Sequence, residues 1–442
     1  MSCAIGIDIG TGKAAVVAID TGGALRDSAS VKTKADIPVP EGRSEQNAAA
    51  ILEAVGRAVK SIDPEIRRRI SAVGITGQMH GMILWNDEEA SPLYTWKDKR
   101  TLEGGFLDKI RRKPGCRKLR AGFGSATLAY LAARNELGRW SSAGTIHDYF
   151  ACKICALAKP LTDPSDAASW GLFDIRKKQW NFAAIGKLKI PAKFFPKVVP
   201  AGAQAGRLSG EYSSLFGLPE GIPVHAPIGD NQASILATAN NTDEEIYLTL
   251  GTGGQLSVVI PEKMINEIKR CATVEVRPFV GQKYIAVAAP LCGGQAFEWL
   301  INSLQTWLKE LGISPPGQDE FYRIIDILGL KSNGDSLAIK PNFLGERDDF
   351  SLRGEISGIT LGNFSLGNIS AALARGVIAN IQRMMPDEIF RDKKTVVCSG
   401  NAIRRLKILQ EAVKTRFHLP IRILPKSEEA ALGAARVAMP PS

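Results

Sequence analysis

The chain has 442 residues, of which 45% are hydrophobic and 23% are charged, and its formal net charge is +11. These fractions are typical of a globular protein, and the length exceeds one ordinary hydrophobic core, so we expect at least two domains. Lys and Arg are scattered, with local clusters only at 67–69 and 111–120. We therefore expect an anionic ligand and no nucleic-acid partner.

The seven cysteines are spread along the chain. Cys152 and Cys155 form a lone C-x-x-C in an apolar stretch that is typical of a helix, and no second ligand pair follows. We interpret them as core thiols rather than a zinc site. Asp8 interrupts the first apolar run, which argues against a signal peptide, and no apolar stretch is long enough to span a bilayer. We expect a cytoplasmic protein with no membrane partner.

Strand-like and helix-like runs alternate along the chain, which predicts an α/β fold. The predicted strands are Ala4–Ile9, Ala14–Ile19, Ile70–Ile75, Val224–Ile228, Ile246–Leu250, Leu256–Ile260, Tyr284–Ala289, Thr395–Cys398 and Ile421–Leu424. The predicted helices are Gln46–Ile62, Ser125–Leu137, Asp230–Ala239, Gln295–Gly312, Ser365–Met385, Ala402–Phe417 and Glu428–Met439. The polar stretch Asn240–Asp243 precedes the second half of the pattern, so we predict domains at 1–242 and 243–442.

A Gly-rich turn occurs twice. Ile5–Gly12 reads IGIDIGTG and Tyr247–Gly254 reads YLTLGTGG, and each is an apolar strand that is followed by a second apolar run. Glycines allow backbone N–H groups to approach phosphate oxygens, and the threonine hydroxyl adds a donor. The repeat therefore predicts two half-sites for one polyphosphate.

Two other interpretations of the first turn fit the sequence less well than a phosphate-binding turn does. Gly10–Ala15 fits the dinucleotide fingerprint G-x-G-x-x-A, but that motif needs a helix, and the β-branched run that follows favours a hairpin. A Walker A loop would need glycine at Ile7. Asp8 next to a phosphate turn is unfavourable unless it faces a cation, and Mg²⁺ is the natural one.

Asp230 lies between the two turns, in the string PIGDNQAS at the end of a predicted strand and the start of a predicted helix. Aspartate is a good helix N-cap, and the same position suits a base that orients a hydroxyl and accepts its proton late in phosphoryl transfer. Both roles are compatible. Two phosphate turns and one such carboxylate indicate a phosphotransferase.

Polar and aromatic side chains follow strand ends in the first half. They are Gln78, Met79 and His80, then Trp96, Asp98 and Arg100, then His147 and Asp148. Hydrogen-bonding groups and an indole in such loops are what a polyhydroxylated ligand needs. The alternative is that these residues are structural, with His147 at a helix cap and Trp170 in the core.

The chain resembles the FGGY carbohydrate kinases from Ile5 to about Ala438. General family motifs are the two turns, GDNQAS and Gly433–Ala435. More specific strings, all in family order, are GITGQMHG (74–81), TWKDKR (95–100), GFGSAT (122–127), AGTIHDY (143–149), AASWG (167–171) and LGER (344–347), and they resemble the sedoheptulokinase branch most. The resemblance implies two actin/hexokinase/Hsp70-like (ribonuclease H-like) α/β domains with a ligand cleft between them, and an ATP- and Mg²⁺-dependent kinase.

The resemblance also implies roles at matching positions. Asp230 would be the catalytic base, and Asp8 with Asp230 would place Mg²⁺. The nucleotide and its phosphates would be held by Asp8, Thr11, Gly12, Lys13, Gly251, Thr252, Gly253, Ser399, Gly400 and Asn401. The sugar would be held by Gln78, Met79, His80, Trp96, Asp98, His147, Asp148, Asp230 and Asn231.

The implied reaction is phosphorylation of a primary hydroxyl of a ketose, with sedoheptulose giving sedoheptulose 7-phosphate as the preferred interpretation. A xylulokinase-like pentulose kinase is one alternative. A degenerate kinase that senses sugar or nucleotide is another, because the family pattern D-x-G-T-T-S-x-K is here interrupted by Gly12, Lys13, Ala14 and Ala15. The expected partners are the sugar and Mg-ATP, and a homodimer stays open.

Overall fold

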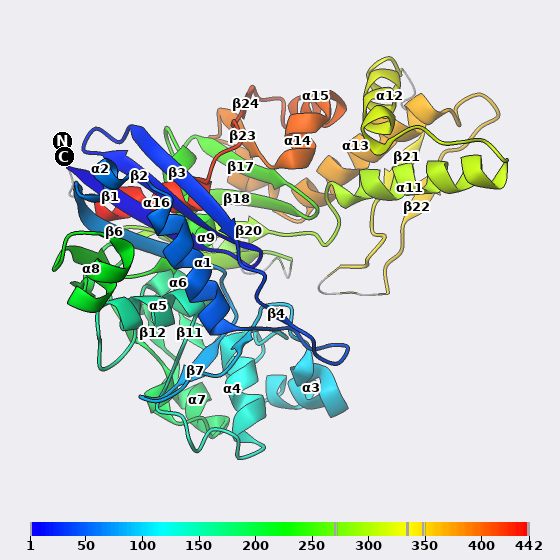
Figure 1. The fold of residues 1–442 in the computed structure, drawn as a ribbon. Helices are drawn as coiled ribbons and strands as arrows, with labels where there is room; N and C mark the ends of the chain where they lie inside the picture. Colours follow the sequence, from blue (N-terminus) through cyan, green and yellow to red (C-terminus); the bar gives the residue numbers. More distant parts are fainter. Residues whose placement is uncertain are drawn as a thin grey trace. The chain divides into compact units, whose positions relative to one another are not determined.

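The computed structural model describes residues 2–268, 271, 273–332, 336–346, 349 and 351–439. The chain divides into two compact units (Figure 1). Unit 1 comprises Met1–Thr238, Arg277–Gly281 and Glu428–Ser442, and unit 2 comprises Ala239–Val276 and Gln282–Ser427. The chain first leaves unit 1 after Thr238, close to the division predicted at 242/243, and it returns to unit 1 twice.

Unit 1 contains a seven-stranded sheet with the order β14-β15-β6-β1-β2-β3, in which β16 also pairs with β6. These strands are β14 (Gln204–Arg207), β15 (Pro223–His225), β6 (Ile70–Gly77), β1 (Cys3–Ile9), β2 (Lys13–Asp20), β3 (Leu25–Lys32) and β16 (Ile228–Gly229). β1 is antiparallel to β2 and parallel to β6. The predicted hairpin around the first Gly-rich turn is therefore confirmed.

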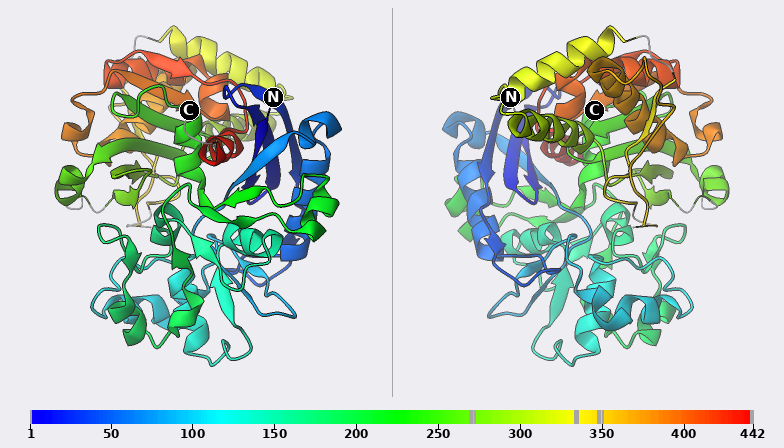
Figure 2. Two further views of the ribbon diagram at one scale, coloured as in Figure 1. Left: turned by 90° about the vertical axis from the view of Figure 1, so that its left-hand side faces the viewer. Right: turned by 90° about the vertical axis from the view of Figure 1, so that its right-hand side faces the viewer.

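Both faces of this sheet are buried, and the period of two along β1 and β2 decides which residues face which helix. Ile5, Ile7 and Ile9 share a core with α1 (Ala48–Lys60). Ala4, on the opposite face, packs with the small residues of α16 (Glu429–Ala438). Figure 2 shows α16, in red, beside the blue strands of this sheet.

Glycine permits the close packing of α16. A Cβ on Gly74 of β6 would lie 1.9 Å from the Ala434 carbonyl oxygen. A Cβ on Gly433 would lie 1.8 Å from the carbonyl oxygen of Ala233, on α9 (Asp230–Thr238). This contact places the last helix of the chain in unit 1, next to the helix that begins at Asp230.

The remainder of unit 1 consists of short elements, many of which surround a second core of aromatic and aliphatic residues, whereas α5 and α8 pack in the first core. Its helices are α2 (Pro64–Arg67), α3 (Phe106–Arg111), α4 (Gly124–Ala132), α5 (Ile146–Ile154), α6 (Pro164–Ala168), α7 (Phe182–Lys187) and α8 (Gly210–Phe216). Its short strands are β4 (Asp36–Ile37), β5 (Glu45–Gln46), β7 (Ile83–Trp85), β8 (Leu93–Tyr94), β9 (Ser142–Gly144), β10 (Leu161–Thr162), β11 (Phe173–Asp174), β12 (Gln179–Trp180) and β13 (Lys197–Val198).

Unit 2 repeats the same plan. Its six-stranded sheet has the order β19-β20-β18-β17-β23-β24, and β17 is antiparallel to β18 and parallel to β23. The strands are β17 (Glu245–Leu250), β18 (Gly254–Pro261), β19 (Glu275–Pro278), β20 (Lys283–Ala288), β23 (Thr395–Ser399) and β24 (Ile421–Ile423), with a separate pair β21 (Ala338–Lys340) and β22 (Glu355–Ser357). The helices are α10 (Ile265–Ile268), α11 (Gln295–Glu310), α12 (Gln318–Leu330), α13 (Leu366–Arg383), α14 (Asn401–Arg405) and α15 (Lys407–Phe417).

One predicted helix is wrong in detail. Ala402–Phe417 was expected to be continuous, but it is divided into α14 and α15 at Leu406, whose φ of −110° and ψ of 106° are extended. The Leu406 side chain is 1% exposed, so its burial in the core fixes a bend that helical periodicity does not reveal. The helices α2, α3, α6, α7, α8, α10 and α12 were not predicted, and the predicted helix Ser125–Leu137 ends earlier, at Ala132 of α4.

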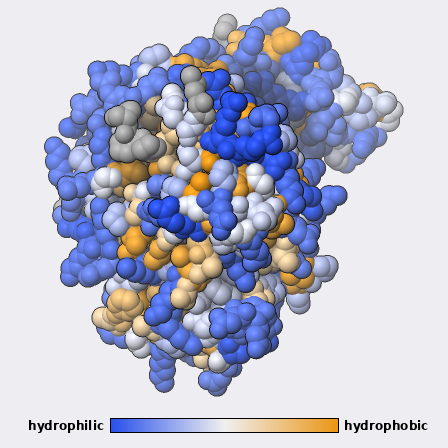
Figure 3. Space-filling model, turned by 60° about the vertical axis from the view of Figure 1, so that its left-hand side comes forward, coloured by the Kyte–Doolittle hydropathy of each residue, from blue (hydrophilic) through white to orange (hydrophobic). Residues whose placement is uncertain are grey.

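Within the described residues, no helix combines the length and apolar character needed to cross a membrane. Hydrophilic residues cover most of the face drawn in Figure 3, with apolar residues in small groups among them.

Replacement of Gly433 by valine should destabilise unit 1 by about 1–3 kcal/mol or more, because the new side chain meets backbone atoms of α9 that have no room to move. The free energy of unfolding in urea measures this. Gly186→Ala in α7 is the control, since nothing lies within 4 Å of its added Cβ, and it should be neutral or slightly stabilising. Equal midpoints for the two variants would contradict the packing argument.

Candidate functional site

The Gly-rich turn of unit 1 is held in place by side chains. The Gly10 amide donates to the Lys13 carbonyl at 3.0 Å and closes the turn. The Thr11 hydroxyl donates to Gln78 Oε1 at 3.2 Å and accepts from Trp96 Nε1 at 3.1 Å. Three of the predicted site residues, from three separate strings, therefore meet at one hydroxyl. Gly12 is exposed at the tip of the turn.

Asp8 and Asp230 lie at the same edge of the sheet. β6 is parallel to both β1 and β16, and its Thr76 pairs with Asp8 on one side and with Ile228 on the other. The Thr76 hydroxyl also donates to the Ile228 carbonyl at 2.7 Å. Because parallel strands end at the same edge, the two carboxylates are placed near each other.

Burial and mutual repulsion act on these two carboxylates. Burial and, to a smaller extent, the nearby charge of Asp230 together raise the pKa of Asp8 to about 7. Burial also raises the pKa of Asp230, whereas the Arg277 guanidinium opposes that rise. Both residues keep a partly exposed surface. A cation in contact with both would relieve the repulsion.

The carboxylates of Asp8 and Asp230 are a donor pair that fits Mg²⁺. Among the described residues no group of three or more His, Cys, Asp or Glu side chains is arranged to hold a metal ion. Mg²⁺ characteristically keeps several waters and takes one or two carboxylates together with substrate phosphates. Asp8 and Asp230 supply such a pair, and Asp8 accepts no hydrogen bond from any described residue that would have to be broken.

Asp230 is the first residue of α9, and its Oδ1 accepts from the Asn231 amide at 2.7 Å. The preceding residue, Gly229, donates its amide to Ser165 Oγ at 3.0 Å. The end of β16 is thus tied to α6, and the carboxylate is carried by a fixed backbone. A positioned carboxylate of this kind can accept a proton from a bound hydroxyl.

Gln78, Met79 and His80 follow β6 directly. Gln78 Nε2 donates to Gln46 Oε1 at 3.0 Å, and Gln78 and Met79 are each 4% exposed. His80 has a positive φ of 73°, which is unusual for a residue other than glycine and is typical of functional sites. Its ring stacks on Phe123 with centroids 4.6 Å apart, and its amide donates to Ser169 Oγ at 3.1 Å.

Asp98 is engaged within the protein. It is 1% exposed and accepts hydrogen bonds from the Ser44 amide at 2.9 Å and from Arg100 Nε at 2.8 Å. Arg100 also pairs with Glu45 at 2.5 Å. This buried ion cluster orders the loop that carries Trp96, which is 38% exposed. Asp98 thus stabilises this loop from within the protein, and the Trp96 indole lies at the surface.

His147 and Asp148 are buried, at 0% and 2% exposure, and so lie out of reach of a ligand in this structure. Asp148 forms a capping box with Thr145 at the start of α5. His147 Nε2 lies 2.7 Å from Asp166 Oδ2, and although burial lowers its pKa, the Asp166 carboxylate raises it to about 9. His147 Nδ1 faces Gly77 at the end of β6. His147 thus packs against the end of β6, and Asp148 stabilises the start of α5.

Two further strings are also structural. Trp170, from the string AASWG, is 1% exposed and packs in the second core of unit 1 against Trp180. Ser125, from the string GFGSAT, is fully buried in α4. Arg347, the last residue of LGER, lies outside the described residues.

Lys13 makes an ion pair. Its ammonium lies 2.7 Å and 2.5 Å from the two carboxylate oxygens of Glu428, the residue that precedes α16. The side chain remains 46% exposed. Lys13 is therefore next to the first phosphate turn but is occupied by a carboxylate in this structure.

The second turn, Gly251–Gly253, is held by backbone groups at the start of α11. The Gly294 amide donates to the Gly251 carbonyl at 2.9 Å, and the Gly293 and Gln295 amides donate to the Thr252 carbonyl at 3.2 Å and 3.0 Å. A Cβ on Gly293 would lie 2.3 Å from Gly253. This close approach explains the glycine at position 293.

Ser399, Gly400 and Asn401 lie at the same edge of unit 2 as the second turn. Ser399 pairs with Thr249 on the parallel strand, and their hydroxyls are 2.9 Å apart. Gly400 has a φ of 97°, and a Cβ there would lie 2.2 Å from the Leu250 carbonyl oxygen. Asn401 begins α14. The predicted phosphate and nucleoside strings of this unit are thus neighbours.

Three residues near these groups were missed from the sequence: Gln46, Ser169 and Arg277. Arg277 Nη2 lies 3.3 Å from His80 Nε2 although the two residues are far apart in the chain. Ser169 lies in the string AASWG but was not singled out, and no local motif marks Gln46 or Arg277. Each of the three acts through a contact that only folding creates.

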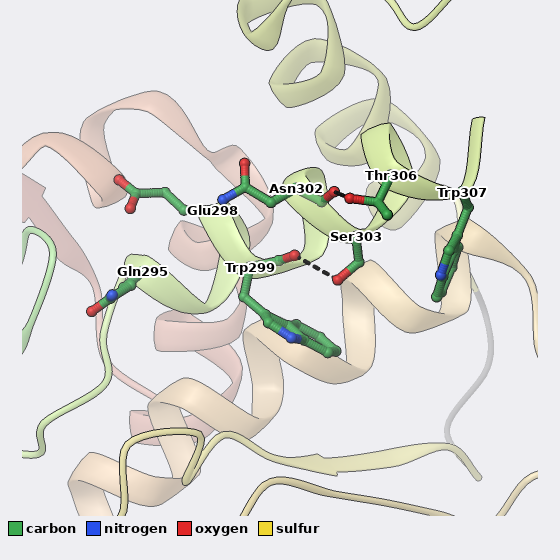
Figure 4. Close-up of a pocket in the computed structure, with 7 residues that line it drawn as sticks. All are labelled: Gln295, Glu298, Trp299, Asn302, Ser303, Thr306 and Trp307. Carbon is green, nitrogen blue, oxygen red and sulfur yellow. Dashed lines mark hydrogen bonds between the residues drawn. The ribbon is translucent and has the colours of Figure 1, made fainter. Parts of the chain in front are cut away.

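A separate pocket of about 440 Å³ lies on α11 in unit 2, and the predicted site residues lie elsewhere. It is lined by Gln295, Glu298, Trp299, Asn302, Ser303, Thr306 and Trp307. Figure 4 shows the two indoles on one face of the helix with Ser303 and Thr306 between them. Both hydroxyls donate to backbone carbonyls of their own helix, at 2.9 Å.

Asp163 is a buried carboxyl group, and the effect of its burial on stability can be tested. Burial raises its pKa to about 7, so the folded protein keeps a proton that the unfolded chain releases near its ordinary value. The folded state then binds more protons between these values, and stability should fall as the pH rises. As the pH rises from about 5 to about 8, the free energy of unfolding, measured with urea, should decrease less for Asp163→Asn than for the unmodified chain. Equal losses would contradict this assignment.

Comparison with known proteins places these observations in a family. Residues 3–237 match the model of the FGGY family of carbohydrate kinases, N-terminal domain. The chain is 30% identical to a sedoheptulokinase of Homo sapiens and 28% identical to one of Mus musculus, each over 98% of this chain and 96% of the relative. It is 24% identical to a xylulose kinase of Staphylococcus xylosus over 99% of this chain and 90% of the relative.

The fold is similar to that of solved sugar kinases. A crystal structure of xylulose kinase from Rhodospirillum rubrum superposes with a TM-score of 0.84 at 20% identity, and the match covers 98% of this chain and 89% of that one. The architecture is therefore the two-domain actin-like α/β fold that the sequence predicted. The chain belongs to the FGGY family of carbohydrate kinases, in which ATP is used to phosphorylate a sugar.

Proposed function

We propose that this sugar kinase phosphorylates the primary C7 hydroxyl of sedoheptulose, with Asp230 as the base. The observation that carries the proposal is the meeting of Asp8, Asp230 and the Thr11 turn at one sheet edge, beside His80. The two sedoheptulokinases, at 28% and 30% identity over nearly the whole chain, support this substrate.

In the proposed reaction, Asp230 accepts a hydrogen bond from the hydroxyl and takes its proton as the sugar oxygen bonds to the γ-phosphorus of ATP. The bond from that phosphorus to the bridging oxygen breaks, and ADP leaves. The tie from Gly229 to Ser165 fixes the carboxylate for this task. Asp8 and Asp230 would hold Mg²⁺, which supplies positive charge to the phosphate oxygens when bound. Trp96, fixed by its bond to Thr11, offers a flat apolar face to the C–H groups of the sugar.

Nucleotide recognition is proposed for both Gly-rich turns. In unit 1, Thr11 and Gly12 are the proposed phosphate contacts. In unit 2, the proposed phosphate contacts are Gly251, Thr252 and Gly253, and the proposed nucleoside contacts are Ser399, Gly400 and Asn401. The shared edge of β17 and β23 supports this grouping. Lys13 can contact phosphate only after it leaves Glu428, so ATP has to compete for it with that carboxylate.

The Lys13–Glu428 pair also favours one alternative. A chain whose first turn has lost its usual hydroxyls and whose lysine is paired could bind ligands without turnover, as a sensor. An assay of ADP release with sugar and Mg-ATP decides between the two, since a sensor would release none above background.

Asp230→Asn should lower kcat by about 10²–10⁴-fold while sugar binding is kept, because the amide preserves the shape of the carboxylate but cannot take the proton. Steady-state kinetics and calorimetric sugar binding measure the two quantities. Asp174→Asn, on the short strand β11, is the matched control and should keep full turnover. Near-normal turnover of Asp230→Asn would remove Asp230 as the base.

Sedoheptulose should be preferred to D-xylulose by at least about tenfold in kcat/KM, since a site built to pair with the hydroxyls of a longer chain rejects ligands that lack them. Both sugars should be assayed in parallel with Mg-ATP. Equal values, or a preference for xylulose, would overturn the substrate and leave the kinase assignment in place.

A further inference from the structure

Arg277 reaches the proposed sugar pocket from a distant part of the sequence. It belongs to β19, yet the segment Arg277–Gly281 is part of compact unit 1, unlike the residues on either side of it. The carbonyl of Pro278 accepts a hydrogen bond from Gln232 Nε2 at 3.1 Å. Gln232 is 1% exposed and lies on α9, the helix that begins at Asp230, so this segment is anchored beside the proposed base.

The guanidinium of Arg277 contacts the string that follows β6. Its Nη2 lies 3.3 Å from His80 Nε2, and its Nη1 lies 3.8 Å from Met79 Sδ. The charge of Arg277 also acts on Asp230. One cationic side chain is therefore shared by the proposed base and by two proposed sugar contacts.

The direction of the contact with His80 follows from the other ring nitrogen. His80 Nδ1 lies 2.8 Å from the Ser169 carbonyl oxygen, which can only accept, so Nδ1 carries the proton. Nε2 is then an acceptor, and Arg277 donates to it. The ring cannot turn away, because it stacks on Phe123 and its backbone is held at a φ of 73°.

We infer that Arg277 is a specificity-determining residue, whose guanidinium donates a hydrogen bond to a sugar oxygen next to the hydroxyl held by Asp230. This inference rests on the proposed function and names a contact of the same site. A guanidinium has only donors, so it selects an oxygen acceptor at that place. A ligand without that oxygen would lack this hydrogen bond from a charged donor and would bind more weakly.

A purely structural Arg277 would brace β19 against His80 and would not touch the sugar. The two roles differ in what they change. A structural residue alters stability and affects both ligands, whereas the inferred contact alters sugar binding and leaves nucleotide binding as it was.

The test uses the full chain with Arg277→Met and Arg277→Lys. Calorimetric titration with sedoheptulose alone, and separately with ATP alone, gives the two affinities. Arg277→Met should weaken sugar binding by at least about tenfold, the usual effect of a lost hydrogen bond from a charged group, and leave ATP affinity within about twofold. Arg277→Lys keeps the positive charge but lacks the planar set of guanidinium donors. Its sugar affinity should therefore lie between those of the unmodified chain and Arg277→Met.

Arg323→Met is the matched control, because Arg323 is an exposed arginine on α12 that pairs with Glu320 on its own helix. It should match the unmodified chain in both affinities. Sugar binding unchanged in Arg277→Met, with the unmodified chain binding sedoheptulose, would overturn the inference alone. Equal weakening of sugar and ATP would also overturn it, in favour of the structural role. No ketose binding by the unmodified chain would overturn the proposed function and the inference together.

Discussion

The site depends on the parallel pairing of β6 with β1 on one side and with β16 on the other. Thr76 stands opposite Asp8 and Ile228, and its buried hydroxyl binds the Ile228 carbonyl. This register brings together two carboxylates that are remote in the sequence. A shift of one residue in either pairing would turn one of them to the opposite face of the sheet.

The sheet keeps this geometry because both of its faces are covered. α1 packs large aliphatic residues on one face, and α16 packs glycine and alanine on the other. Gly74 allows backbone contact between β6 and α16 on that second face, and Gly433 allows backbone contact between α16 and α9. α16 thus supports β1, although the two elements are far apart in the sequence.

Charged groups beneath the sheet edge also hold the site. His147 and Asp166 form a buried pair, and Ser165 on the same short helix accepts the amide of Gly229. Burying such groups costs free energy, and proteins retain this cost mainly where function needs it. The Gly-rich turns of the two units are held in different ways. Side chains bind the turn of unit 1, whereas backbone amides bind the turn of unit 2.

Sequence alone determined the local parts. The β-branched run after Gly10 predicted a hairpin rather than a helix, and the strings around Gln78 and Trp96 assigned both residues to one site. These features depend on short-range periodicity and turn chemistry, which neighbouring residues fix. Only the tertiary structure decided that Asp98 and His147 are buried supports, that Lys13 pairs with Glu428, and that Arg277 meets His80. Each of these rests on contacts between distant segments, whose burial and pairing follow from how the chain packs.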